Sequence, residues 1–168
     1  VNRDVFGNVT ISQVANAYNT FAGAVKVVFS NSTVYTRGID GTSTTTTSRI
    51  LYSYSNGEAD SDLVTRLDRE GLSEIDNSLR GKIAGTIGVL IGAREYDPTT
   101  VVSIDAFGNE TRSEVTNTYI LAFNGQAKVH TATTEITEMI MMDGSVFIRS
   151  TSIANTVTYE YTGENETA

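Results

Sequence analysis

The sequence contains no cysteine and only one proline in 168 residues. Without cysteine, neither disulfides nor thiolate metal sites can form. No apolar run approaches the roughly 18 residues that a membrane-spanning helix requires. Basic residues are also few, so that the net charge is −8 and the pI is about 4.6. Because nucleic acid is bound through a basic patch, we expect no nucleic-acid partner, and we expect no membrane span.

Threonine is the residue that the chain has in excess, at 25 of the 168 positions. Its branched Cβ favours strands over helices. Alternating apolar segments recur along the chain, separated by turn signals such as Asn56-Gly57 and Asp143-Gly144. This pattern predicts a mainly β domain of about eight to ten antiparallel strands, arranged as a β-sandwich or jelly roll. The alternative is a single, strongly bent sheet wrapped round the helices.

A short helical insertion is predicted around residues 62–80. Apolar residues recur there at spacings of three and four, with Leu63 and Leu67 near its start and Leu79 near its end. Asp60-Ser61 is placed to cap its first turn. Two short helices between strands are typical of a crossover packed on one side of a sheet.

Two further segments need an interpretation. Residues 81–93 alternate large apolar residues with glycine and alanine, which predicts a central strand that ends at Asp97-Pro98. Residues 14–21 fit either a short helix or a continuation of the strand before them, because Val14, Tyr18 and Phe21 fall at helical spacing.

The first strand is the segment that we expect to decide the function. Val1, Val5, Val9 and Ile11 share one parity, with Gly7 between them, which is the period-two pattern of a half-buried strand. Such a strand must add to a sheet, either its own or that of a neighbour. We therefore interpret these five residues as a donor strand. The chain divides into this N-terminal strand (1–14), a β-sandwich domain (20–162) and an exposed tail (163–168).

Four sequons could accept N-glycans in a glycosylating organism. Their asparagines are Asn8, Asn31, Asn109 and Asn165. The sequence opens on valine, which suggests that a signal peptide has been removed. These features together favour an extracellular or cell-surface protein.

No residue pattern indicates an enzyme. His130 is the single histidine, and the sequence has no GxSxG motif to supply it with a nucleophile. Glu135 and Glu138 fall on opposite faces of their strand, so they do not form a carboxylate pair. The acidic residues after Gly57 lack the glutamate that completes a calcium loop. We expect no catalytic residue, no metal and no cofactor.

A cysteine-free, sequon-bearing β-domain with an alternating apolar N-terminal strand resembles the subunits of archaeal surface filaments. These are the threads and bundling pili with TasA-like jelly-roll domains. The resemblance implies that the N-terminal strand of one subunit completes the sheet of the next. The chain would then be a structural subunit of an extracellular homopolymer that grows head-to-tail, with identical subunits as partners.

Two other functions fit the same composition. The first is a monomeric secreted β-domain that binds a glycan or a lipid, for which the pairs Tyr52/Tyr54 and Tyr159/Tyr161 could form a sugar platform. The second is a surface-layer or adhesin module. In the first case the N-terminal strand would pair within its own sheet.

Overall fold

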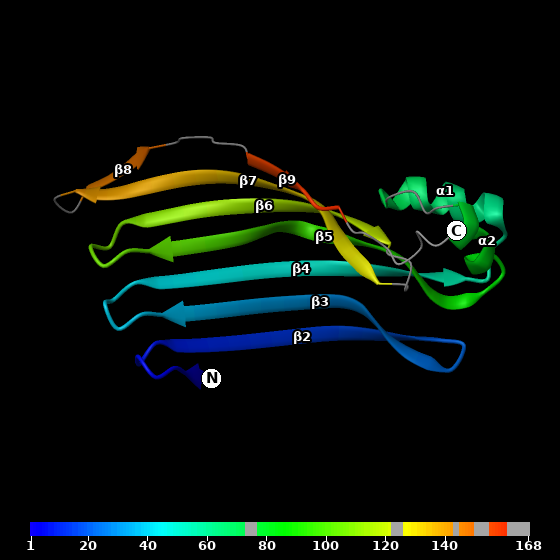
Figure 1. Ribbon diagram of the computed structural model, residues 1–168, viewed down its shortest axis with the longest axis horizontal. Helices are drawn as coiled ribbons and strands as arrows, with labels where there is room; N and C mark the ends of the chain where they lie inside the picture. Colours follow the sequence, from blue (N-terminus) through cyan, green and yellow to red (C-terminus); the bar gives the residue numbers. More distant parts are fainter. Residues whose placement is uncertain (73–76, 122–125, 143–144, 150–154, 161–168) are drawn as a thin grey trace.

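A computed structural model describes residues 1–72, 77–121, 126–142, 145–149 and 155–160, and it shows a mainly β protein (Figure 1). Its elements are β1 (Asn2–Arg3), β2 (Val9–Phe21), β3 (Ala24–Arg37), β4 (Ser43–Asn56), α1 (Asp60–Glu70), α2 (Asn77–Ile83), β5 (Ile87–Ile104), β6 (Glu110–Leu121), β7 (Ala127–Met142), β8 (Ser145–Arg149) and β9 (Asn155–Thr158).

All of these strands belong to one antiparallel sheet, in which each strand pairs with the next along the chain from β1 to β8. β9 also pairs with β7, on residues that β8 leaves uncovered. Figure 1 shows the strands stacked in this order, with the two helices at one end of the sheet. The described strands therefore form one meandering sheet, and the second sheet that a sandwich or jelly roll requires is not among them.

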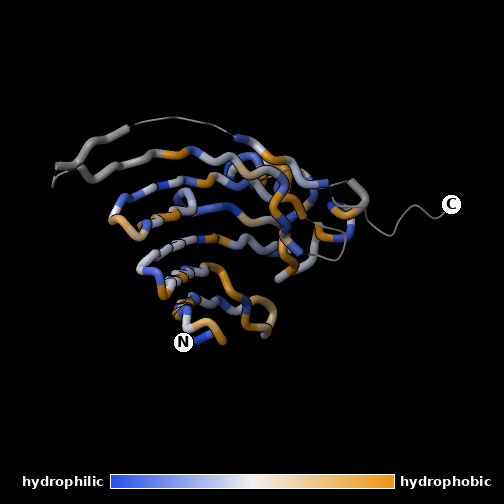
Figure 2. Tube along the Cα trace, turned by 60° about the vertical axis from the view of Figure 1, so that its left-hand side comes forward, coloured by the Kyte–Doolittle hydropathy of each residue, from blue (hydrophilic) through white to orange (hydrophobic). Residues whose placement is uncertain are grey.

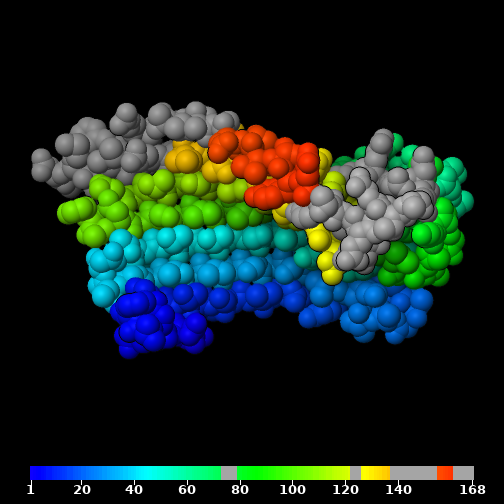
Figure 3. Space-filling model, in the orientation of Figure 1, coloured from blue at the N-terminus to red at the C-terminus, as the bar shows by residue number. Residues whose placement is uncertain are grey.

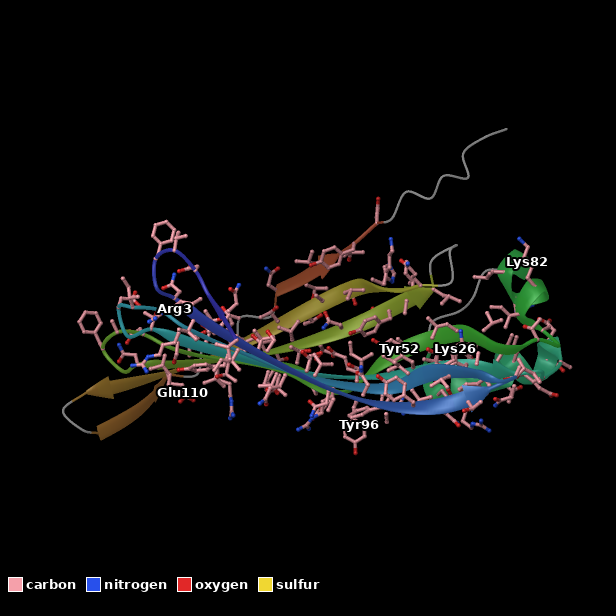
Figure 4. All side chains as sticks on the ribbon, turned by 90° about the horizontal axis from the view of Figure 1, so that it is seen from below. Arg3, Lys26, Tyr52, Lys82, Tyr96 and Glu110 are labelled. Atoms are coloured by element: carbon pink, nitrogen blue, oxygen red, sulfur yellow. The ribbon has the colours of Figure 1, made fainter. Side chains whose placement is uncertain are left out.

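The single sheet is long, twisted and bent, which agrees with the alternative expectation more closely than with the sandwich. Seen edge-on, β6, β7 and β9 rise out of the plane of β2 to β4 towards the helix end (Figure 4). Register shifts break the pairing of β4 with β5 at several points, and such bulges bend a sheet and increase its twist. Short hydrophobic and hydrophilic segments alternate along the strands (Figure 2), as expected where neither face is fully covered.

The buried core is small and lies at the helix end. Leu63 and Leu67 of α1 pack with Leu72, Ile83 and Ile91 into one apolar cluster. The side chain of Leu63 is completely buried. The two helices thus cover one end of the sheet and leave the remainder of it uncovered among the described residues.

An ion-pair network holds α1 against the sheet. Arg66 contacts Glu58 at 2.5 Å and Glu70 at 3.0 Å, and its guanidinium also donates to the carbonyl oxygen of Tyr54 at 2.5 Å. The Arg66 side chain is only 14% exposed. Because a half-dehydrated charge is costly unless it is paired, these contacts fix the position of α1 on β4.

The structure confirms the helical insertion and corrects its details. α1 begins at Asp60 after Ala59, and no side chain caps it, so the predicted Asp60-Ser61 cap is wrong. Asp60 instead accepts a hydrogen bond from Arg80 of α2 at 2.6 Å. The helix ends at Gly71, whose φ of 64° is the left-handed conformation that terminates many helices.

Two predictions about strands are also corrected, and one open question is decided. Residues 1–14 are not a single strand, because a turn at residues 4–8 separates β1 from β2. Residues 81–86 belong to the end of α2 and a turn, while β5 continues past Pro98 to Ile104. Proline is tolerated there because Pro98 falls at a register shift, where it has no partner on β4. Residues 14–21 are strand and not helix, because β2 runs from Val9 to Phe21. This strand is continuous across the predicted boundary between the N-terminal strand (1–14) and the β-sandwich domain (20–162).

Candidate functional site: the free edge and the repeated turns

The outer edge of β2 is the most unusual feature of the sheet. β1 covers β2 only at Val9 and Thr10. From Ile11 to Phe21, no described strand pairs with the outer side of β2. In the space-filling view β2 forms the lower margin of the molecule (Figure 3). The chain therefore has a long strand edge whose backbone groups face outwards.

This edge has few of the features that normally prevent strand pairing between molecules. The sequence of β2, VTISQVANAYNTF, contains no charged residue and no proline. Natural edge strands are usually short, charged, bulged or covered. Among the described residues, the stretch from Ile11 to Phe21 has only one of these protections, a register shift between Ala17 and Tyr18. Its side chains from Ser12 to Thr20 are all exposed.

The five predicted donor residues lie in different surroundings. Val9 and Ile11 belong to β2 and pair with Arg37 and Tyr35 of the same chain. The other three are outside β2: Val1 and Val5 are each 94% exposed, and Gly7 lies in a turn with φ of 90°. In this monomer the N-terminal segment is thus part of its own sheet, and the donor role of these residues stays a prediction.

Two turns at the same end of the sheet have almost the same sequence and the same hydrogen bonds. They are Asp4-Val-Phe-Gly-Asn8 and Asp105-Ala-Phe-Gly-Asn109. In each, the aspartate carboxylate accepts from two backbone N–H groups and from the asparagine side chain. The turn from Gly38 to Thr42 repeats the backbone pattern, with Gly38 N–H bonded to the Thr42 carbonyl oxygen and Gly41 N–H to that of Gly38. This repeat was not predicted, although the shared letters D-x-F-G-N in the sequence indicate it.

The repeated turns have consistent electrostatics. The hydrogen bond from the Asn8 side chain is the largest cause that holds the pKa of Asp4 below its ordinary value. The Asn109 side chain lowers the pKa of Asp105 in the same way. Because these hydrogen bonds stabilise the ionised form, each carboxylate stays charged and holds the backbone N–H groups of its turn in place.

Apolar side chains project from the tips of the turns. Phe6 is 75% exposed, Ile39 75% and Phe107 89%. Figure 1 places the three turns, which join β1 to β2, β3 to β4 and β5 to β6, at the end of the sheet opposite the helices. The three exposed apolar side chains therefore lie along one end of the sheet, each on a hydrogen-bonded turn.

The structure separates the sequons into distinct groups. Asn8 and Asn109 occupy the last position of the two repeated turns. Asn31 lies inside β3 between Ala15 and Arg49, and its Oδ1 is buried without a hydrogen-bond partner among the described residues. Asn165 and the predicted tail lie outside the described residues. In Asn8 and Asn109 the side-chain Nδ2, to which a glycan would be attached, donates to an aspartate carboxylate, at 2.8 and 2.7 Å.

The two faces of the sheet differ in charge near the turn end. Residues directly paired across a ladder share a face. One face, which we name the hydroxyl face, has no charged residue at these positions: Thr10, Thr36, Thr44, Ser103, Thr111, Ser12, Val34, Thr46, Val101 and Ser113. The other, which we name the mixed face, contains both charged and larger apolar residues: Val9, Arg37, Ser43, Ile104, Glu110, Ile11, Tyr35, Thr45, Val102 and Arg112.

Other titratable residues do not gather into a reactive centre in the described part of the chain. His130 lies in β7, where its carbonyl oxygen accepts the N–H of Tyr159 at 2.7 Å. Burial, together with nearby Glu95 and Tyr52, raises the pKa of Tyr119 to about 12. The described residues include no group of three or more histidine, aspartate or glutamate side chains that could hold a metal ion.

Comparison with models of known protein families, with characterised proteins and with solved structures gave no significant match. Neither described helix combines the length and the apolar character needed to cross a membrane.

Proposed function

We propose that the protein is a structural subunit of an extracellular filament and that copies join through the free edge of β2. The observation that carries this proposal is the uncharged, exposed edge from Ile11 to Phe21. An added strand would satisfy the outward backbone groups of β2 with the same hydrogen bonds that β3 supplies on the inner side.

The proposed contact is head-to-tail. The opposite margin of the sheet consists of β8 and β9 beside β7. If this margin of one copy adds to β2 of the next, the surfaces in contact differ, so the assembly does not close and a filament grows. Exchange of the N-terminal strand itself, with Val1, Val5, Gly7, Val9 and Ile11 inserted into a neighbour, is the second form of the same proposal. Addition is favoured because β2 already pairs with β3 along its whole length.

A neighbouring copy would also supply the second layer of the predicted sandwich. The mixed face presents Ile11, Tyr35, Val102 and Ile104 together with charges of both signs, which suits packing against another sheet. Ile11, Tyr35 and Val102 are already half-buried in a single copy, so packing against a second sheet would contribute only part of the roughly 1.5–3 kcal/mol that complete burial of an exposed apolar side chain gives. The hydroxyl face would remain in contact with water, and glycans on Asn8 and Asn109 would add to that hydrated exterior.

The test is the size of the assembly, by light scattering and negative-stain microscopy. The intact protein should form filaments, and a version that lacks residues 1–12 should not. Because this deletion also shortens β2, two single substitutions give a sharper test. Consecutive residues of an antiparallel strand direct their backbone groups to opposite sides, so only one of Ala15→Pro and Asn16→Pro removes an outward N–H.

The substitution that leaves the β2–β3 ladder folded, identified by circular dichroism and thermal unfolding, should abolish filaments. Intact protein that stays a compact monomer under all conditions would refute the proposal. So would filaments that persist in the folded proline variant.

A further inference from the structure

A pocket with an unusual lining lies on the strands β2 to β5, away from the buried core. Its volume is about 340 Å³, within the range of small-molecule sites. The residues that line it are Asn16, Val27, Ser30, Tyr52, Tyr54 and Leu90. Four strands contribute to it, so its shape is fixed by the ladder and not by a loop.

The lining combines three kinds of surface. Tyr52 and Tyr54 provide two aromatic rings, and Phe21 supports the second, with ring centroids 5.1 Å apart. Val27 and Leu90 provide aliphatic walls. Asn16 and Ser30, which are paired across β2 and β3, provide an amide and a hydroxyl at one side.

No charged residue lines the pocket. Burial raises the pKa of Tyr52 and of Tyr54, which shows that both phenols are partly removed from water and remain neutral at ordinary pH. Tyr52 and Ser30 have the strand parity of the hydroxyl face, so the pocket continues into a surface of threonine and serine hydroxyls. Figure 4 shows Tyr52 on the opposite side of the sheet from Tyr96.

We infer that this pocket binds one neutral pyranose ring of a glycan. A pyranose has an apolar face of C–H groups, which stacks on an aromatic ring, and a rim of hydroxyls, which both donate and accept hydrogen bonds. The tyrosines match the first property and Asn16 with Ser30 the second. An acyl chain would offer no hydrogen bond to the Asn16 amide or the Ser30 hydroxyl, and a charged sugar would find no counter-charge among the lining residues. Asn16 of β2 lines the site, but the site uses side chains on one face of the sheet and not the outward backbone groups of β2, so it does not depend on the filament proposal.

The experiment is an NMR titration of unglycosylated protein with methyl β-glucopyranoside, methyl α-mannopyranoside and methyl β-galactopyranoside. Sorbitol, an open-chain polyol that presents hydroxyls but no ring face, is the control. We expect at least one glycoside to shift the Tyr52 and Leu90 signals saturably, with a Kd on the order of 1 mM. The inference is overturned if no glycoside does so, or if sorbitol shifts them equally.

Substitutions locate the site. Tyr52→Ala should weaken binding roughly tenfold, whereas Tyr52→Phe, which keeps the ring, should bind nearly as well as the parent. Tyr96→Ala, on the other side of the sheet, should have no effect. If Tyr52→Ala does not fold, the comparison of Tyr54→Leu, which removes a ring, with Asn16→Ala, which removes the amide, still separates stacking from hydrogen bonding. Equal affinity in all folded variants would exclude this pocket.

The sugar could come from a separate polysaccharide or from a glycan on a neighbouring copy. Glycosylated protein distinguishes the two. If the protein's own glycan fills the pocket, its Tyr52 signal is already shifted, and Asn8→Gln with Asn109→Gln restores it. If the source is external, glycosylated and unglycosylated proteins show the same free-state signal and the same response to the glycoside. Either result supports pyranose binding in this pocket only if a methyl glycoside also shifts the Tyr52 and Leu90 signals saturably.

Discussion

The carboxylate of Asp105 accepts the N–H groups of Phe107 and Asn109, at 2.8 and 2.9 Å, and the Asn109 side-chain amide at 2.7 Å. Asp4 makes the equivalent bonds near the N-terminus, at about the same distances. At the scale of single residues, a short polar side chain thus replaces the backbone partners that a tight turn lacks. The same residues bring two of the four sequon asparagines to the surface.

This arrangement predicts a loss of stability in acid. In the folded state the pKa values of Asp4 and Asp105 lie below the ordinary value of 3.8. The two carboxylates therefore stabilise the folded state fully above pH 3.8, and this stabilisation is lost as the pH falls through the lowered pKa values. In Asp4→Asn/Asp105→Asn protein, urea unfolding should therefore vary less with pH below about 4. Ala106→Asn, in the same turn, is the control and should keep the parent pH dependence. An unchanged slope in the double variant would contradict the role given to these carboxylates.

At the scale of elements, the sheet and the helices contribute unequally to the core. Strands β2 to β4 are mostly half-buried or exposed, while α1 supplies two of the five residues in the buried cluster. An isolated layer of sheet buries little apolar surface, so the helix end must provide much of the hydrophobic stabilisation of a single copy.

Leu63→Ala should accordingly reduce the free energy of unfolding by about 2–5 kcal/mol, because it opens a cavity in the one well-packed region. Val25→Ala, at a side chain that is 67% exposed in β3, should change it by less than about 0.5 kcal/mol. Urea unfolding followed by circular dichroism measures both values. Similar losses in the two variants would mean that the helix end is not the main source of stability.

At the scale of the whole molecule, the net charge of −8 opposes association of identical copies. The free edge of β2 has no charge of its own. We therefore expect assembly to proceed faster as salt rises from about 0.01 M to 0.15 M, since the Debye length falls from about 30 Å to 8 Å. Light scattering at a fixed protein concentration gives the rate.

A variant with Asp68→Asn and Glu160→Gln, which has two fewer negative charges, should assemble faster at low salt and respond less to added salt. If salt instead slows assembly of the parent, the main contact between copies would be ion pairs. The uncharged edge of β2 would then not be the main contact.

The sequence alone determined the elements of this protein. The threonine content and the period-two pattern identified most strands, and leucines at spacings of three and four identified α1, because both patterns depend on local backbone geometry. The candidate site was predictable only in part. Residues 1–14 were predicted as one alternating strand, whereas a turn at residues 4–8 separates β1 from β2. The repeated turns were missed, and residues 14–21 were left open between helix and strand.

Tertiary structure decided what each pattern packs against. Alternation in a strand is the same whether its apolar face meets a second sheet, a helix or a neighbouring molecule, so the sequence predicted a sandwich where the described strands form one sheet. Pro98 appeared to end a strand because local rules exclude it from a ladder, yet a register shift accommodates it. The free edge of β2 and the tyrosine pocket both depend on which strands are neighbours, and strand order is a property of long-range pairing that no short stretch of sequence contains.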